Sequence, residues 1–335
     1  VEESRNEIRM YYGQGGYLET RVAATRSPTM ETGAIDLAFV VRESEQYRLE
    51  SVNIQGNTKT KSIVILRELA LRPGEVFDLK RMETSKLRLE NTRYFESVAM
   101  RPETIDIPGR KDLGIVVQEG RTGNLTFGAG FSSIERVVFY AELTQGNFDL
   151  FNPRNYFQGD GQKFRVRFQI GSRSNEIIIS FEEPWLFEQR LAFGFEAFRS
   201  ETDFVSTSFN ELRTGFEVYL RRRLFELVEG RLSYRFEIVD IQDVSPFASP
   251  IIRQEAGRRT VSKLGLVLLR DTRNDLLFPT RGMRIQTLTE VAGGPLAGET
   301  DYVKMEFRGS KFWKTFDLFE QTFFILARTG MAWPY

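Results

Sequence analysis

Paired carboxylates are the residues of this chain that could do bond chemistry. Glu182 and Glu183 are neighbours, and Asp271 and Asp275 are four residues apart. A glycosidase needs two carboxylates at a fixed separation across the scissile bond, and nothing in this sequence fixes such a separation. The 335 residues include no His and no Cys, which excludes His-dependent nucleophile systems and imidazole or thiolate metal sites. We therefore predict a protein that is not an enzyme and that carries no cofactor or metal.

Two further groups of residues suggest ligands at first sight. Gly128-Ala129-Gly130 lacks the third glycine and the following helix of a dinucleotide-binding loop. Arg221-Arg222-Arg223 could bind acidic headgroups, but a solvated hairpin turn is the favoured interpretation. The 46 basic residues balance 46 acidic ones, which argues against a nucleic-acid partner bound through counterion release.

The first 120 residues have the spacing of mixed helices and strands. Residues 1–45 predict one helix followed by two strands, Val22–Thr25 and Ala34–Val41. The next unit has the order β-α-α-β-β, with predicted elements at Tyr47–Gln55, Lys61–Leu71, Leu79–Thr92, Phe95–Arg101 and Leu113–Gln118. In its first helix, Ile63, Leu66 and Leu69 with Ala70 form the expected apolar stripe. The first 45 residues therefore resemble the last α-β-β of a second copy.

From about residue 123 the helical spacing gives way to alternating strands. Between Asn124 and Gly330 we find about eleven segments in which apolar and polar residues alternate, as in Lys163–Ile170 and Arg231–Ile238. A soluble β-sandwich is one explanation. A transmembrane barrel is favoured, because the strands are near the length needed to cross a bilayer at a tilt and one face carries many charges. Aromatic residues expected on the apolar face near strand ends are Phe164, Phe181, Trp185, Phe187, Tyr219, Phe312 and Trp313.

The connections differ in length in a way that is typical of outer-membrane barrels. Gly171–Asn175 is tight, whereas Asp240–Thr260 is long and contains two prolines. Such barrels alternate short periplasmic turns with long external loops. We therefore expect these two connections to lie at opposite ends of the sheet.

Several motifs follow one another along the chain. The β-α-α-β-β unit contains Val52-x-Ile54-x-Gly56-Asn57-x-x-Thr60, Arg67-x-Leu69, Gly74-x-x-Phe77, Thr92-x-Tyr94-Phe95-x-x-Val98 and Leu113-x-Ile115-x-Val117-x-Glu119. The strand region contains Asn155-Tyr156-Phe157-x-Gly159-x-Gly161, Phe181-x-Glu183-Pro184-Trp185, and Asp271-x-Arg273 followed by Phe278-Pro279-Thr280-Arg281-Gly282. On these motifs the chain resembles the BamA-type outer-membrane assembly and translocation proteins, in which POTRA domains precede a barrel of sixteen strands.

The resemblance implies a fold and a division into domains. It implies α+β POTRA repeats followed by an antiparallel transmembrane β-barrel, of which about eleven of sixteen strands are present. Residues 1–45 would be the C-terminal part of one POTRA domain, residues 46–121 a complete POTRA domain, and residues 122–335 the first two-thirds of the barrel. The family's Arg-Gly-Phe/Tyr loop motif has no counterpart here, so we expect the sequence to be a fragment.

The resemblance also implies a function without bond chemistry, namely assembly and insertion of β-barrel proteins into the outer membrane. A two-partner secretion pore, or a passive porin or receptor with periplasmic domains, is the alternative. The implied partners are unfolded outer-membrane proteins, accessory assembly lipoproteins and outer-membrane lipid, with the POTRA domains in the periplasm.

Two strands would carry this function. An unfolded polypeptide could add itself to the free edge of the POTRA sheet, which we expect at Ser97, Val98, Ala99, Met100 and Arg101. The first barrel strand would form one side of a lateral gate and comprises Asn124, Leu125, Thr126, Phe127, Gly128, Ala129, Gly130, Phe131 and Ser132. Its small residues at alternate positions predict few cross-strand contacts and easy opening of the barrel seam.

Overall fold

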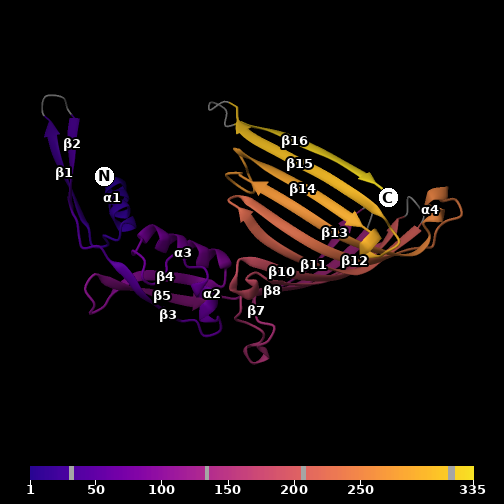
Figure 1. The fold of residues 1–335 in the computed structure, drawn as a ribbon, viewed down its shortest axis with the longest axis horizontal. Helices are drawn as coiled ribbons and strands as arrows, with labels where there is room; N and C mark the ends of the chain where they lie inside the picture. The colour runs from indigo at the N-terminus through magenta and orange to yellow at the C-terminus, as the bar shows by residue number, and fades with distance from the viewer. Residues whose placement is uncertain (30–33, 133–135, 205–208, 316–320) are drawn as a thin grey trace. The chain divides into compact units, whose positions relative to one another are not determined.

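The computed structural model describes residues 1–29, 34–132, 136–204, 209–315 and 321–335. It divides into two compact units (Figure 1). One unit comprises residues 1–122 together with 146–161, and the other comprises residues 123–145 and 162–335. The segment 146–161 therefore packs with the N-terminal unit although it connects two strands of the C-terminal one.

The N-terminal unit contains the predicted β-α-α-β-β domain. Its elements are β3 (Arg48–Gln55), α2 (Ser62–Leu66), α3 (Leu79–Thr92), β4 (Phe95–Thr104) and β5 (Arg110–Glu119). The sheet has the order β3-β5-β4, with β5 parallel to β3 and antiparallel to β4. The largest buried core side chains are Leu49, Ile65, Phe77, Leu89, Leu113 and Ile115.

The two helices differ in how well the sequence predicted them. The predicted bounds of α3 are correct, because Asp78 caps its first turn by accepting hydrogen bonds from the backbone of Lys80 and Arg81. The expected Lys61–Leu71 helix is shortened to Ser62–Leu66, and its apolar stripe is wrong at Ile63 and Leu66, whereas Leu69 packs against the core. The structure buries Val64 and Ile65, while Ile63 and Leu66 are exposed. A helix of little more than one turn leaves too few positions to set the phase of a 3.6-residue period.

Before this domain lie a helix and a two-stranded ribbon. Helix α1 spans Glu2–Gln14, and β1 (Arg21–Thr29) pairs with β2 (Ala34–Arg42) in an antiparallel ladder. β1 is longer than predicted and continues through Ser27 and Pro28, whose backbones pair with Asp36 and Ile35. None of the helices among the described residues is long and apolar enough to span a membrane.

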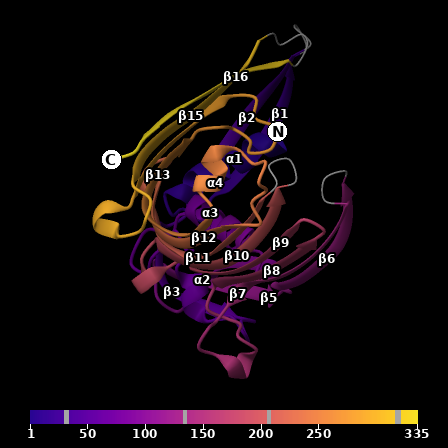
Figure 2. The same ribbon diagram turned by 90° about the vertical axis from the view of Figure 1, so that its right-hand side faces the viewer.

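The C-terminal unit is one antiparallel sheet of eleven strands, which confirms the predicted strand region. Each strand pairs with its neighbours in the chain, so the order runs from β16 to β6 without a crossover. The sheet curves round from β6 to β16, and these two edge strands do not pair with one another within the described residues (Figure 2). The strands are β6 (Gly123–Ser132), β7 (Arg136–Phe148), β8 (Gln162–Gly171), β9 (Ser174–Glu183), β10 (Leu191–Phe204), β11 (Phe209–Phe225), β12 (Val228–Gln242), β13 (Gly257–Asp271), β14 (Gly282–Ala292), β15 (Tyr302–Lys314) and β16 (Thr322–Trp333).

Short helical turns lie in four of the connections. They are η1 (Pro153–Asn155), η2 (Leu186–Glu188), α4 (Pro250–Gln254) and η3 (Gly294–Leu296).

Alternation along the strands gives the sheet a charged face and an apolar face. On the charged face, ion pairs join strands β11 to β16 through four glutamates. These glutamates are Glu217, Glu237, Glu290 and Glu306, and the bases between them are Arg235, Lys263 and Lys304, with Arg328 at the end. Glu237 and Glu306 are buried, whereas Leu264 and Leu266 of the apolar face are exposed. We therefore assign the charged face to the concave side, where side chains crowd one another.

Two residues expected on the apolar face lie on the charged face. Tyr219 donates a hydrogen bond to Glu182 at 2.7 Å, and Phe312 pairs with Gly282 and Phe324 on the side of Arg284 and Arg328. Phe164, Phe181 and Trp313 have the register of the apolar face, as predicted. Aromatic character alone did not distinguish the two faces, because Tyr219 uses its hydroxyl to satisfy a charged neighbour.

The connections alternate between two ends of the sheet. We call the end at which β6 begins the proximal end, and the opposite end the distal end. The tight β8–β9 turn and the long β12–β13 connection both lie at the distal end. The expectation that Gly171–Asn175 and Asp240–Thr260 lie at opposite ends is therefore wrong. The end at which a connection lies depends on the number of strands before it, and the length of the connection does not reveal that number.

Candidate functional site

Strand β4 lies at one edge of the three-stranded sheet, because β5 is the only strand that pairs with it among the described residues. The predicted segment Ser97–Arg101 falls within it. Val98 is buried in the core of the domain, whereas Ala99 and Arg101 are exposed. A bulge between Phe95 and Ser97 shifts the register at the start of the strand. Backbone groups at such an edge can pair with an added strand of almost any sequence.

Strand β6, which contains all nine residues predicted for the gate, forms one edge of the large sheet. Its apolar positions Leu125, Phe127 and Phe131 are exposed on the face opposite to Gly128. The expectation that its glycines leave few cross-strand contacts needs correction at Gly128. A Cβ atom placed there would lie 2.7 Å from the Tyr140 ring, so Tyr140 of β7 already fills that space. The Tyr140 ring packs over Gly128 and supplies cross-strand contacts between β6 and β7. It does not contact the other edge of β6.

The predicted motif Asn155, Gly159 and Gly161 lies in segment 146–161, which binds the loop before α2. The backbone N–H of Lys61 donates to the Gly159 carbonyl at 2.8 Å, and the Tyr94 hydroxyl donates to the Gly161 carbonyl at 3.1 Å. Gly159 has φ +128°, and a Cβ there would lie 2.2 Å from the Lys59 carbonyl. The glycine is therefore required by both backbone conformation and close approach.

Lys61 connects the two chain segments through an ion-pair cluster. Its Nζ lies 2.9 Å from Oδ2 of Asp149, which is fully buried, and 3.1 Å from Oδ1 of Asp160. Next to it, Asn147 Nδ2 donates to Thr60 Oγ1 at 2.8 Å. Burial would lower the pKa of Lys61, but hydrogen bonds to Asp149 and Asp160 raise it above its usual value.

Glu119 fixes the same loop from the end of β5. Its carboxylate accepts hydrogen bonds from Thr58 Oγ1 at 2.7 Å and from the backbone N–H groups of Lys59 at 3.0 Å and Thr60 at 2.6 Å. Burial would raise the pKa of Glu119, but these hydrogen bonds lower it below its ordinary value. The loop that binds segment 146–161 is therefore held by a charged acceptor at the last residue of the POTRA motif.

The motif Phe181, Pro184 and Trp185 ends β9 and begins the β9–β10 connection. The backbone N–H of Trp185 donates to Glu183 Oε1 at 2.9 Å, and the Arg190 guanidinium lies 5.4 Å from the centre of the Trp185 ring. Phe187 has φ 55° and is exposed at the tip of the connection. This motif therefore terminates a strand and shapes a turn.

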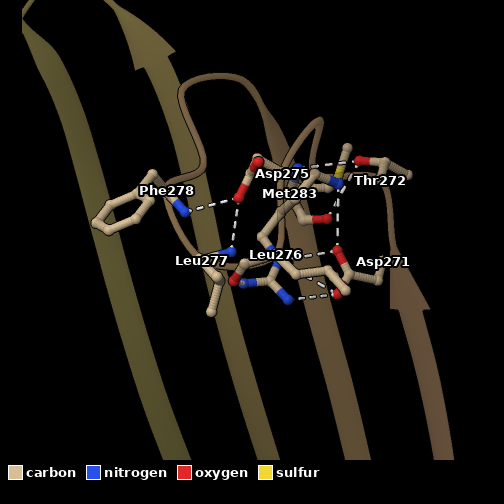
Figure 3. A network of polar contacts seen from close by, with 8 residues as sticks. Asp271, Thr272, Asp275, Leu276, Leu277, Phe278 and Met283 are labelled. Atoms are coloured by element: carbon tan, nitrogen blue, oxygen red, sulfur yellow. Dashed lines mark hydrogen bonds and ion pairs between the residues drawn. The ribbon is translucent and has the colours of Figure 1, made fainter.

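The motif Asp271, Arg273, Phe278, Pro279 and Gly282 forms the β13–β14 turn. Figure 3 shows Asp271 and Phe278 with their neighbours Asp275, Leu276 and Leu277. Arg273 binds both carboxylate oxygens of Asp271, at 2.9 and 2.7 Å, and its Nη1 donates to the Leu276 carbonyl at 3.3 Å. Asp275 accepts the backbone N–H groups of Leu277 and Phe278 at 2.7 and 2.8 Å, which lowers the pKa of its carboxyl. Gly282 has φ +101°, and a Cβ there would lie 2.2 Å from the Thr272 carbonyl.

The carboxylates that could suggest catalysis have structural partners. Glu182 binds Lys163 and Arg221 at 3.0 and 2.9 Å, while Asp271 and Asp275 hold the β13–β14 turn. Arg221 lies in β11, so the predicted hairpin turn at Arg221–Arg223 is displaced to Glu226 and Leu227. Within the described ranges, no three His, Cys, Asp or Glu residues cluster so that they could hold a metal ion.

Sequence reasoning missed Lys61, Asn147, Asp149 and Asp160. These residues are far apart in the chain and ordinary in type. Only the two flanking glycines, Gly159 and Gly161, signalled that another part of the chain approaches this segment.

A β-α-α-β-β domain followed by a curved antiparallel sheet with an apolar convex face defines a membrane β-barrel protein of the POTRA-containing class. Residues 156–334 match the family model of the Omp85 superfamily domain, and residues 47–120 match the POTRA model, described as a surface antigen variable number repeat. Because the first match covers more than half of the chain, this chain belongs to the Omp85 superfamily.

Known relatives agree with this membership. The chain is 29% identical over 298 residues to the outer membrane protein assembly factor BamA of Nitratidesulfovibrio vulgaris (strain Hildenborough), which aligns 88% of this chain with 36% of that protein. It is 23% identical to the BamA of Neorickettsia risticii (strain Illinois), which aligns all of this chain with 44% of that protein. The chain thus spans less than half the length of these relatives.

A solved structure shows the same fold. BamA from Haemophilus ducreyi lacking POTRA domains 1–3 superposes with a TM-score of 0.77 at 18% identity, covering 99% of this chain and 64% of that one. The resemblance to BamA-type proteins and the predicted fold class are confirmed.

Proposed function

We propose that this chain is the part of an outer-membrane assembly protein that receives β-barrel proteins at its strand edges and inserts them into the membrane. The observation that carries the proposal is that β4 of the POTRA domain and β6 of the large sheet are both edge strands among the described residues. An unfolded client can satisfy its backbone hydrogen bonds on such an edge before it reaches lipid. The names of the BamA relatives support the same activity.

The proposed path needs no bond chemistry. A client strand pairs first with β4 at Ser97–Arg101, in the periplasm, and later with β6 where the barrel seam opens sideways into the membrane. The driving force is the client's own folding and the burial of its apolar face in lipid. Accessory lipoproteins would dock on the POTRA surface, which carries Lys80, Arg81, Lys86, Arg88 and Arg93 on or directly after α3.

Depletion of the full-length protein tests this proposal. Levels and heat-modifiable folding of several unrelated outer-membrane barrels should fall together. If those barrels stay normal while one secreted polypeptide disappears, the protein is a two-partner secretion pore instead. If only the uptake of small solutes changes, it is a passive porin or receptor.

A further inference from the structure

Apolar side chains project from three successive connections at the proximal end of the large sheet. Phe187 lies in the β9–β10 connection, Phe225 ends β11, and Leu276, Leu277 and Phe278 form the tip of the β13–β14 turn. Those three tip residues are 72%, 83% and 81% exposed. At the distal end the tight β8–β9 turn consists of Ser172 and Arg173, and the long β12–β13 connection exposes Phe247 and Ile251, which are not adjacent in the chain. Contiguous exposed apolar residues of this kind mark an interaction surface.

Side-chain hydrogen bonds to the backbone hold the apolar tip of the β13–β14 turn (Figure 3). Asp275 accepts the backbone N–H groups of Leu277 and Phe278, and Arg273 donates to the carbonyl of Leu276. Asn274 Oδ1 accepts the N–H groups of Thr280 and Arg281 at 3.0 and 2.9 Å. Because the chain itself satisfies these groups, they need no water partners, which lowers the cost of moving the apolar tip out of water.

A bulge in the neighbouring β11 turns another aromatic residue to the apolar face. The register of β11 against β12 shifts between Arg223 and Phe225, and Phe225 then pairs with Val228. Val228 lies an even number of positions from Leu232 and Ile238 along β12, so its side chain is on the same, apolar face. Without the shift, Phe225 would share the charged face with Arg221 and Arg223.

The apolar band of the convex face begins at these proximal turns. On β10 the outward positions are apolar from Leu191 to Ala197 and become charged at Arg199 and Glu201, toward the distal end. On β12 they are apolar from Val228 to Ile238 and become charged at Asp240. The proximal turns therefore lie where the lipid-facing surface ends.

Two arginines point outward at the same rim. Arg222 opposes Gly230, and Arg270 opposes Val228, both on the apolar face. Neither forms an ion pair with any other residue that the structure describes. Guanidinium groups bind phosphate oxygens through paired hydrogen bonds.

We propose that the proximal rim of the sheet is a phospholipid-binding anchor, seated in the headgroup region of the adjoining leaflet. Leu276, Leu277 and Phe278 insert between lipids, and Arg222 and Arg270 bind headgroup phosphates. The surface continues the lipid-facing band directly, which favours phospholipid over a protein partner. This inference concerns how the sheet is seated in the bilayer and is separate from assembly of clients.

Site-directed spin labelling tests the anchor, because the chain contains no Cys. Leu277→Cys and Phe247→Cys would be introduced separately into a Cys-free full-length protein, labelled with a nitroxide and reconstituted into phosphatidylethanolamine and phosphatidylglycerol vesicles. Phe247 is the matched control, being 98% exposed in the distal β12–β13 connection. A heat-modifiable shift in gel mobility shows that each variant is folded.

We expect the ratio of oxygen to nickel-chelate accessibility to be several-fold higher at position 277 than at position 247. Nickel accessibility at 277 equal to that at 247 would place the tip in water and overturn the proposal. A label at 277 shielded from both reagents would show that a protein covers the tip, and this result would overturn it as well.

A second variant tests the role of the scaffold. Asp275→Ala in the Leu277→Cys background removes the acceptor for two backbone N–H groups, so the label should become more mobile and its accessibility ratio should fall severalfold. Asp275→Asn keeps an acceptor oxygen and should retain most of the ratio. Equal ratios in both variants and the parent would contradict a rigid anchor. Client assembly can be measured in the same proteins, so a failure of the anchor and a failure of the assembly function are distinguishable.

Discussion

Glu119 and Lys61 both stabilise the loop before α2. Glu119 accepts hydrogen bonds from the loop backbone, and Lys61 forms ion pairs with Asp149 and Asp160. Neither residue belongs to a charge cluster that marks a site in the sequence. Each stabilises the loop because the fold brings its partners close to it. Each can be removed by a near-isosteric substitution, so each supports a specific prediction.

Glu119→Gln should destabilise the N-terminal unit by about 1.5–3 kcal/mol, the range for hydrogen bonds to a charged acceptor. The backbone amides of Lys59 and Thr60 should exchange faster with deuterium, since both donate to this carboxylate. The pKa of Glu119 is lowered in the folded protein, so its contribution is present above the unfolded pKa and is lost as pH falls through the folded pKa. Thermal unfolding should therefore show a difference from wild type that shrinks in acid. Glu83→Gln, on the exposed face of α3, is the control and should leave stability unchanged; a similar loss in both variants would contradict this role.

Lys61→Met should loosen segment 146–161, because Asp149 stays buried without its cation. We expect the free energy of unfolding to fall by about 2–3 kcal/mol. This is at or below the lower limit for breaking a buried ion pair, because the Lys61 side chain is 45% exposed. The pKa of Lys61 is raised, so the stabilisation is complete below its unfolded pKa and disappears as pH rises through the folded pKa. Lys59→Met controls for general loss of charge. Adding Asp149→Asn to Lys61→Met should recover part of the stability in a double-mutant cycle; no recovery would show that the pair is not coupled.

At the scale of elements, long periodic strands were predictable and short or distant features were not. About eleven strands were expected from alternation, and the large sheet has eleven. Several residues on each face agree along a strand, so a single exception such as Tyr219 does not hide the pattern. Helix α2 is too short to reveal its buried side. The contact of Lys61 with Asp149 and Asp160 could not be predicted, because it joins segments that share no local pattern.

Strand β6 provides a prediction at this scale. Tyr140→Ala should uncover Gly128 and weaken the pairing of β6 with β7, so amides of residues 124–131 should exchange faster in the folded protein. Phe139→Ala removes an aromatic side chain of similar size from the opposite face, next to Ala129. Equal protection of β6 in the two variants would mean that the cover over Gly128 does not stabilise this strand.

At the scale of the whole chain, the described residues combine a POTRA sheet, in which β4 is an edge strand, with a curved antiparallel sheet, in which β6 is an edge strand. The two edges have the same chemistry, rows of backbone donors and acceptors that accept many sequences. Assembly of diverse barrels needs such tolerance. If the chain acts as proposed, the apolar rim would hold the large sheet at a fixed depth while β6 pairs with a client strand.

A disulfide across the barrel seam tests the central claim most directly. In the full-length protein, Thr126→Cys in β6 would be paired with a Cys at the facing position of the closing strand, and the folding of newly made outer-membrane barrels would be followed with and without reductant. The proposed function predicts that oxidation stops assembly, that reductant restores it, and that each single-Cys variant assembles clients normally. Normal assembly with the seam fully cross-linked would contradict insertion at the β6 edge.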